Sequence, residues 1–179
     1  MKLNIIIFLF VSLFIIRNSY AQFPNGWIGN WEGDLIAHNQ PGDKNQVIKM
    51  KLSIQESPRV GVRLWNIWYD DNNGGAWRNY ELVGDNPESG VYKMDELNSI
   101  TLDMFYFNDA FYSMYAVGKA LITVRYELKD EKIYFEVTSA NIEGERTGGT
   151  EDIPEVINYP VRTVQKAVQI GRASCRERV

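Results

Sequence analysis

Three arginines, Arg63, Arg78 and Arg125, lie inside stretches where polar and apolar residues alternate. Arg78 is followed two positions later by Tyr80, and residues two apart share one face of a β-strand. An inward arginine beside a tyrosine hydroxyl binds a carboxylate or another acidic group through charge-assisted hydrogen bonds. A strand arginine more commonly faces solvent, which is the competing interpretation for each of the three. Arg78, Tyr80 and Arg125 are therefore candidate residues for holding an acidic head group.

About ten short segments with a period of two make up most of the chain. One example is the alternation of Ile48, Met50, Leu52 and Ile54 with Lys49, Lys51 and Ser53, which is typical of a half-buried strand. Residues that favour turns separate the segments, as at 39–43, 70–75 and 84–90. Short links imply that neighbours in sequence pair in order, and closing such a meander removes its exposed edges. The sequence predicts an all-β fold, a single up-and-down antiparallel β-barrel of about 8–10 strands.

The predicted barrel has large or apolar residues on both faces of several segments. A lumen that holds an apolar ligand would explain them, with Trp65, Trp68, Tyr115 and Phe135 as candidate lining residues. The alternative is that aromatic side chains simply fill the lumen, because a barrel of about eight strands is narrow enough to be packed by its own side chains. The longest irregular stretch, residues 141–155, is the best candidate for a mobile flap or rim loop.

The first 21 residues have the pattern of an export signal. Lys2 precedes an apolar stretch at 3–16, and Ser19-Tyr20-Ala21 places small residues at −3 and −1 of a predicted cut just before Gln22. A bilayer-spanning helix needs roughly 20 apolar residues, so a retained anchor is the weaker interpretation. The sequence thus predicts a secreted or periplasmic protein with no stable membrane insertion.

The last ten residues, 170–179, match one reading frame of a widely used DNA-sequencing adapter. We therefore expect a non-native tail at 170–179 and a single barrel domain at 22–169. The alternative, a genuine basic tail, would favour binding to nucleic acid or to an electronegative surface. Residues 22–169 contain 14 Lys and Arg against 22 Asp and Glu, a net charge of −8, which disfavours nucleic acid as a partner.

Cofactors and metals are not expected from the residue types present. The only cysteine, Cys175, lies in the predicted tail, so the core rather than a disulfide must hold the domain together. The only histidine, His38, lies beside the first predicted loop. One histidine without a native cysteine does not suit zinc, and His38 is poorly placed to be a haem ligand.

The opening motif resembles that of the calycin group of ligand-binding barrels. Gly29-Asn30-Trp31 is similar to the Gly-x-Trp that begins a lipocalin, and Trp27-x-Gly29-x-Trp31 to the opening of fatty-acid-binding proteins. The resemblance implies that Gly29 and Trp31 help to close one end of the barrel, with Arg162 of the last strand covering the tryptophan. The lipocalin Thr-Asp-x-x-Tyr element is absent, and the Arg-x-Tyr that fatty-acid-binding proteins carry on their final strand is here Arg78-Asn79-Tyr80, near the middle of the chain.

The leading hypothesis is an exported protein that binds a small hydrophobic molecule, with an acidic head group as an option, in the barrel lumen. The first alternative is a non-enzymatic barrel with a filled lumen that acts as an interaction or structural module of the cell envelope. An enzyme is not expected, because the chain has no recognisable catalytic set. A hydrolase built on Asp95, Glu96 and Asp103 is the third hypothesis.

Overall fold

The structure is a computed structural model that describes residues 23–39, 42, 44–70 and 74–171. The predicted export signal and most of the predicted tail lie outside the described residues. Within the described residues, no helix is both long and apolar enough to traverse a bilayer.

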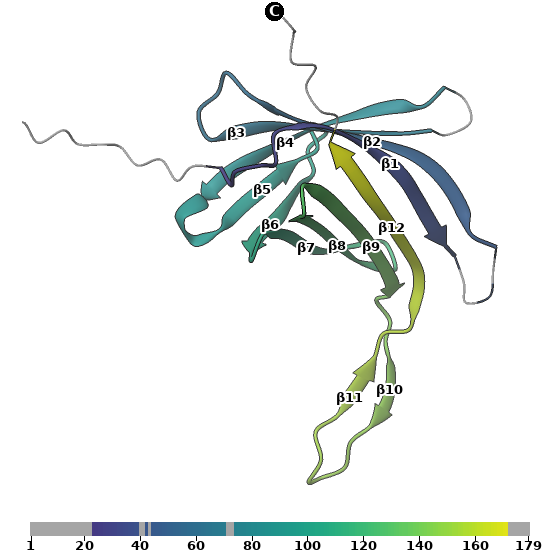
Figure 1. Ribbon diagram of the computed structural model, residues 1–179. Helices are drawn as coiled ribbons and strands as arrows, with labels where there is room; N and C mark the ends of the chain where they lie inside the picture. Colours follow the sequence, from purple (N-terminus) through teal and green to yellow (C-terminus); the bar gives the residue numbers. More distant parts are fainter. Residues whose placement is uncertain (1–22, 40–41, 43, 71–73, 172–179) are drawn as a thin grey trace, which may run out of the picture.

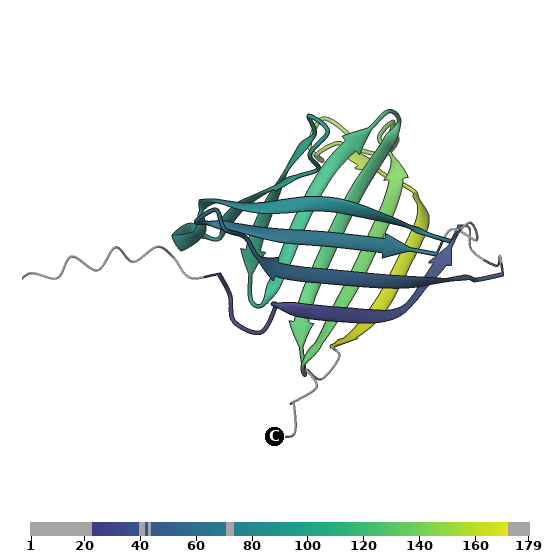
Figure 2. The same cartoon turned by 90° about the horizontal axis from the view of Figure 1, so that it is seen from above.

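Ten strands form one closed antiparallel barrel, which confirms the predicted fold class (Figures 1 and 2). Each strand pairs with its neighbour in sequence from β1 to β9, and β12 lies between β9 and β1 to close the barrel. A 3-10 turn, η1 (Pro87–Ser89), links β4 to β5. The barrel strands are β1 (Gly29–His38), β2 (Gln46–Glu56), β3 (Val62–Tyr69), β4 (Ala76–Asn86), β5 (Val91–Asp95), β6 (Thr101–Phe107), β7 (Ala110–Val117), β8 (Ala120–Lys129), β9 (Lys132–Asn141) and β12 (Val161–Gly171).

Two of the hairpins end in two-residue turns with left-handed backbone. Asp130 and Glu131 have φ of 51° and 56°, and Lys129 pairs with Lys132 across them. The turn at 108–109 has the same form. Positive φ at both central residues gives a twist that matches the twist of the flanking strands. These tight turns fix the register, and the register decides which side chains face the lumen.

One end of the barrel is closed by an aromatic cluster. Trp27, just before β1, is completely buried and packs against Trp65 of β3 and Phe111 of β7, with ring centroids 5.9 and 4.9 Å away. Trp31 lies beside this cluster, and its indole nitrogen donates a hydrogen bond of 3.1 Å to the carbonyl of Trp27. The segment before β1 therefore plugs the lumen at this end, which we call the closed end.

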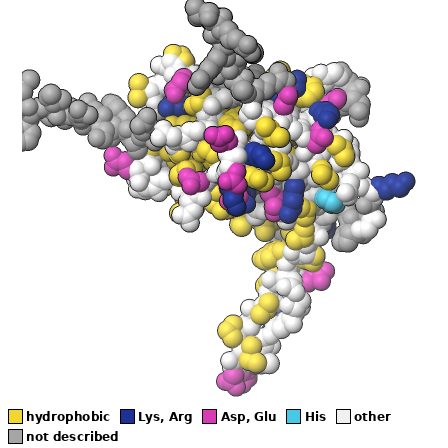
Figure 3. All heavy atoms as spheres, viewed as in Figure 1, with side chains coloured by type: hydrophobic (Ala, Val, Ile, Leu, Met, Phe, Trp, Pro, Cys, Tyr) yellow, Lys and Arg dark blue, Asp and Glu magenta, His cyan; other side chains and the backbone are white. Residues whose placement is uncertain are grey.

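The predicted flap is a projecting hairpin. Between β9 and β12, strands β10 (Glu145–Gly148) and β11 (Val156–Asn158) form a separate two-stranded sheet that extends from the opposite end of the barrel, which we call the open end (Figure 1). All residues of both strands are exposed. Hydrophobic side chains nevertheless lie along it (Figure 3). A two-stranded hairpin without a packed face has little stability of its own, which is consistent with a mobile element.

Gly33 lets β1 and β12 approach closely where the barrel closes. A Cβ atom at this position would lie 2.1 Å from the carbonyl oxygen of Val168 in β12. Forcing extra volume into a packed site typically costs about 1–3 kcal/mol. We expect Gly33→Ala to lower the free energy of unfolding by about that amount in urea denaturation. Gly148→Ala in β10 is the matched control, because a Cβ atom there would meet no other part of the protein within 4 Å, and equal losses in both variants would contradict the close approach.

Strand β12 runs two residues past the predicted end of the domain. Ile170 and Gly171, which the sequence assigned to the added tail, continue the ladder opposite Glu32 and Trp31. The origin of residues 170–179 stays a prediction.

Candidate functional site

A cavity of about 240 Å³ occupies the open half of the lumen. Apolar side chains form most of its wall, among them Ile67, Met94, Met104, Val124 and Phe135. The closed half of the lumen is filled by the aromatic cluster, so the cavity has an apolar floor and a mouth at the open end.

Polar side chains gather at the mouth of the cavity. Arg78, Tyr80, Glu96, Tyr115 and Gln165 all line it. They come from three strands, β4, β7 and β12, and from the end of β5, which the closure of the barrel brings together. Ionisable groups of both signs therefore lie above an apolar chamber, the usual composition of a site for a small amphipathic molecule.

Alternation along β4 directs Arg78, Tyr80 and Leu82 inward. Arg78 and Tyr80 line the cavity and Leu82 is buried below them. The guanidinium carbon of Arg78 lies 5.2 Å from the centre of the Tyr69 ring, within cation–π range. This contact holds the guanidinium beside Tyr69 at the mouth, where Arg78 is exposed and can donate further hydrogen bonds to an anion.

The tyrosines at the mouth keep their protons to unusually high pH. Burial raises the pKa of Tyr80 and of Tyr115, and the negative charge of Glu96 raises both further. The positive charge of Arg78 partly offsets the rise in the pKa of Tyr80. The charges of Glu96 and Arg78 therefore both affect the pKa of Tyr80. At neutral pH the tyrosine hydroxyls are neutral hydrogen-bond donors and acceptors.

Alkaline pH is expected to destabilise the barrel through Tyr69. Burial raises the pKa of Tyr69 from 10.0 to about 12. Above pH 10 the unfolded chain loses this proton while the folded protein retains it, so the stabilisation is complete below pH 10 and declines as the pH rises towards 12. Unfolding free energies measured across this range should fall less steeply in Tyr69→Phe than in the unaltered protein. Equal slopes would contradict a buried Tyr69 hydroxyl.

Two of the predicted ligand-binding residues, Arg125 and Trp68, lie on the outer wall. Arg125 forms an ion pair of 2.8 Å with Glu127 and donates a hydrogen bond of 3.2 Å to the Tyr112 hydroxyl. Trp68 packs outside beneath the ammonium of Lys51, 4.8 Å from its ring centre. Both predictions are wrong for the same reason: Arg125 alternates with inward Val124 and Tyr126, and Trp68 with inward Ile67 and Tyr69.

Trp65 faces inward but does not line the cavity. It belongs to the closed-end cluster, where Trp27, Phe111 and Tyr126 surround it. Its predicted contact with a ligand is therefore corrected to a role in the core. Tyr115 and Phe135 do line the cavity, as the sequence predicted.

Arg162 does not cover Trp31. Strand β12 does lie beside β1, but the two are antiparallel, and Trp31 is opposite Gly171 at the far end of β12. Arg162 is exposed near the open end, beyond the pair formed by His38 and Val164. The closing contact implied by the resemblance is therefore corrected: Gly171 packs against the Trp31 ring, and Gly29 begins β1 as expected.

The three carboxylates of the hydrolase hypothesis do not share one site. Asp103 lies on the outer wall, where Lys93 pairs with it at 3.0 Å. Asp95 accepts a hydrogen bond of 2.8 Å from the backbone nitrogen of Leu97. Glu96 alone faces the cavity, so the wall separates it from Asp103.

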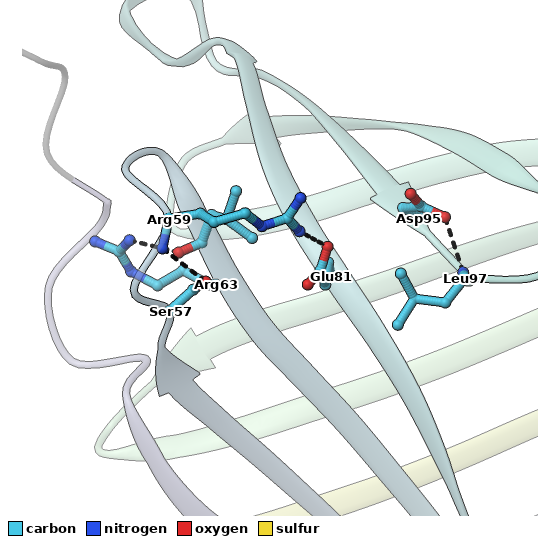
Figure 4. A network of polar contacts seen from close by, with 7 residues as sticks. Ser57, Arg59, Arg63, Glu81, Asp95 and Leu97 are labelled. Atoms are coloured by element: carbon cyan, nitrogen blue, oxygen red, sulfur yellow. Dashed lines mark hydrogen bonds and ion pairs between the residues drawn. The ribbon is translucent and has the colours of Figure 1, made fainter.

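A second and larger depression, of about 420 Å³, lies at the closed end beside Phe23 and the β2–β3 loop. Its two arginines already have acidic partners: Arg59 pairs with Glu81 (Figure 4), and Arg63 lies 3.4 Å from a Glu56 oxygen. The Arg63 guanidinium also lies over the Phe23 ring at 5.1 Å. The lumen cavity is the better candidate site, because it is surrounded by the barrel wall and contains converging groups of both signs.

Besides Gln165 of β12, sequence reasoning missed two residues at the mouth, Tyr69 and Glu96. Tyr69 shares a strand face with Trp65 and Ile67 by alternation, and that face is the inner one. Glu96 continues the alternation of inward Tyr92 and Met94 past the end of β5. The alternation of inward and outward residues could have identified both, provided that one inward residue on each strand was known.

Comparisons with protein-family models and with curated proteins do not assign the chain to a family. No protein-family model matches the chain, and no curated protein matches it either. Inference about function therefore depends on the residues of the barrel.

Proposed function

We propose that this protein is an exported binding protein that holds a small hydrophobic molecule with an acidic head group in the open half of its lumen. The observation that carries the proposal is the cavity of about 240 Å³ into which Arg78 and Tyr80 project above an apolar floor. The guanidinium would bind the acidic group and the apolar floor would bind the hydrocarbon part. Export is supported by the N-terminal signal pattern in the sequence.

The size of the cavity favours a small ligand. Since a water molecule occupies about 30 Å³ in the liquid, the 240 Å³ cavity has room for roughly eight groups of that size. This suits a short alkyl chain or one aromatic ring, with the head group at the mouth. A long-chain fatty acid would leave much of its chain outside.

Membership of the calycin group is part of the same proposal. Its support is the Gly-x-Trp at the start of β1, the closed ten-stranded antiparallel barrel, and a plugged end opposite an open one. The placement of Arg162 at the open end departs from that group's pattern.

The interaction-module alternative is favoured by one feature, the β10–β11 hairpin. It extends from the open end and exposes Ile153, Val156 and Ile157. Exposed apolar side chains on a projecting element are common where one protein contacts another. In this alternative the cavity has no ligand, and the two functions differ in whether small molecules bind.

Binding of small acids tests the proposal. The purified protein is titrated with hexanoate, benzoate, 3-phenylpropionate and palmitate, using calorimetry and thermal unfolding. A ligand that binds only the folded state raises the melting temperature as its concentration rises, and we expect this for a short acid more than for palmitate. No heat and no change in melting temperature with any of them would contradict the proposal and favour the interaction module.

A further inference from the structure

The mouth of the lumen contains a negative charge as well as a positive one. Glu96 lines the same cavity as Arg78, and its carboxylate accepts a hydrogen bond of 3.3 Å from the side-chain amide of Asn98. This hydrogen bond comes from the β5–β6 turn and holds the carboxylate at the rim. Glu96 is half-buried, so a charge placed near it is less screened than one on an open surface.

Register places the two charges close together but not in contact. Glu81 pairs with Asp95 across β4 and β5, so the next position along each strand sets Tyr80 opposite Glu96. Arg78 is two residues from Tyr80 on the same face, which makes Arg78 and Glu96 diagonal neighbours, typically about 7–8 Å apart at Cα. Among the described residues no ion pair joins the two side chains, and both act on the Tyr80 hydroxyl between them.

A ligand with only a carboxylate is a poor match for this mouth. Bound to Arg78, its negative charge would also lie close to Glu96, and like charges in a partly buried site repel each other. A ligand with a carboxylate and an adjacent ammonium would satisfy both residues. Its ammonium would donate to Glu96, and the Tyr80 and Tyr115 hydroxyls would have donors and acceptors within the same head group.

We infer that the lumen selects a small zwitterion, an α-amino acid with an apolar side chain. Its carboxylate binds Arg78 and its ammonium binds Glu96. Its side chain enters the chamber lined by Met94, Met104 and Phe135. The 240 Å³ chamber accepts a branched alkyl group or one aromatic ring. Met94 and Met104 add polarisable thioethers that pack well against an aromatic ring. This inference rests on the proposed function, because it names the ligand class of the same cavity.

Three ligands with one shared ring separate the contributions of the head group. L-phenylalanine carries both charges, 3-phenylpropionate only the carboxylate, and 2-phenylethylamine only the ammonium. Calorimetry on the purified protein is expected to give an affinity for L-phenylalanine about 10-fold or more above the affinity for either single-charge ligand. Glu96→Gln should weaken the binding of L-phenylalanine by about 10-fold. The affinity for 3-phenylpropionate should stay the same or increase, because the carboxylate that repels it is gone.

The outcomes distinguish this inference from the function beneath it. If 3-phenylpropionate binds as tightly as L-phenylalanine, the inference of a zwitterionic ligand is wrong, while the proposal that the lumen binds a small acid is still supported. If 2-phenylethylamine binds best, Glu96 rather than Arg78 holds the head group, which also overturns the inference. If none of the three binds and the short acids fail too, both proposals fall. The ligand comparison needs only the unaltered protein, so it remains decisive even if Glu96→Gln does not fold.

Discussion

Replacement of Trp65 by alanine is expected to lower the free energy of unfolding by about 3–5 kcal/mol, the usual cost of removing a large buried aromatic side chain. Trp65 has no exposed surface and contacts three aromatic rings in the closed-end cluster, those of Trp27, Phe111 and Tyr126. Its removal would leave a void where the N-terminal segment plugs the lumen. Urea denaturation followed by circular dichroism measures the loss.

Trp77→Ala is the matched control for Trp65→Ala. Trp77 lies on the outer wall of β4 and is 50% exposed, so its truncation removes little buried surface. We expect a change of about 0.5 kcal/mol, as for most surface substitutions. Comparable losses in the two variants would mean that the aromatic cluster does not hold the closed end together.

Arg78→Gln is expected to weaken binding of 3-phenylpropionate and of L-phenylalanine by about 10- to 100-fold, the range that loss of a charge-assisted hydrogen bond implies. Both ligands carry a carboxylate, and the described part of the chain presents only one arginine to the cavity. Glutamine retains hydrogen-bonding groups and much of the length, so the variant removes the charge with little change in packing. Calorimetric titration of each variant gives the affinities.

Arg125→Gln supplies the control for this substitution. Arg125 also lies in the middle of a strand, but its guanidinium is on the outer wall with Glu127 and Tyr112. Its replacement should leave both affinities unchanged. A loss of affinity in Arg125→Gln that equals the loss in Arg78→Gln would mean that the ligand does not bind in the lumen.

Most of the fold could be predicted from the pattern of strands and turns in the sequence. Alternation at 48–54, and turn residues between the segments, were sufficient to predict an antiparallel barrel because hydrophobic period and turn chemistry are local properties. Alternation also placed Arg78, Tyr80 and Leu82 on one face, and the structure has all three inward.

The candidate site was harder to predict, because a strand has two faces and its sequence alone does not say which one is inner. Trp65 and Trp68 were both predicted to line the lumen, yet residues three apart on a regular strand face opposite sides. Arg162 was misplaced for another reason: the resemblance supplied the last strand but not its direction relative to β1. Predicting the position of Glu96 beside Tyr80 would have required the register between β4 and β5, which is a long-range property.

The most direct test of a ligand-binding lumen is a titration followed by the NMR signals of the methionine methyl groups. Met94 and Met104 line the cavity, whereas Met114 is 69% exposed on the outer wall of β7. On addition of L-phenylalanine or 3-phenylpropionate to the labelled protein, we predict saturable shifts of the Met94 and Met104 signals and none of the Met114 signal. Shifts confined to Met114, or no shift at any of the three under conditions where calorimetry detects binding, would contradict binding in the lumen.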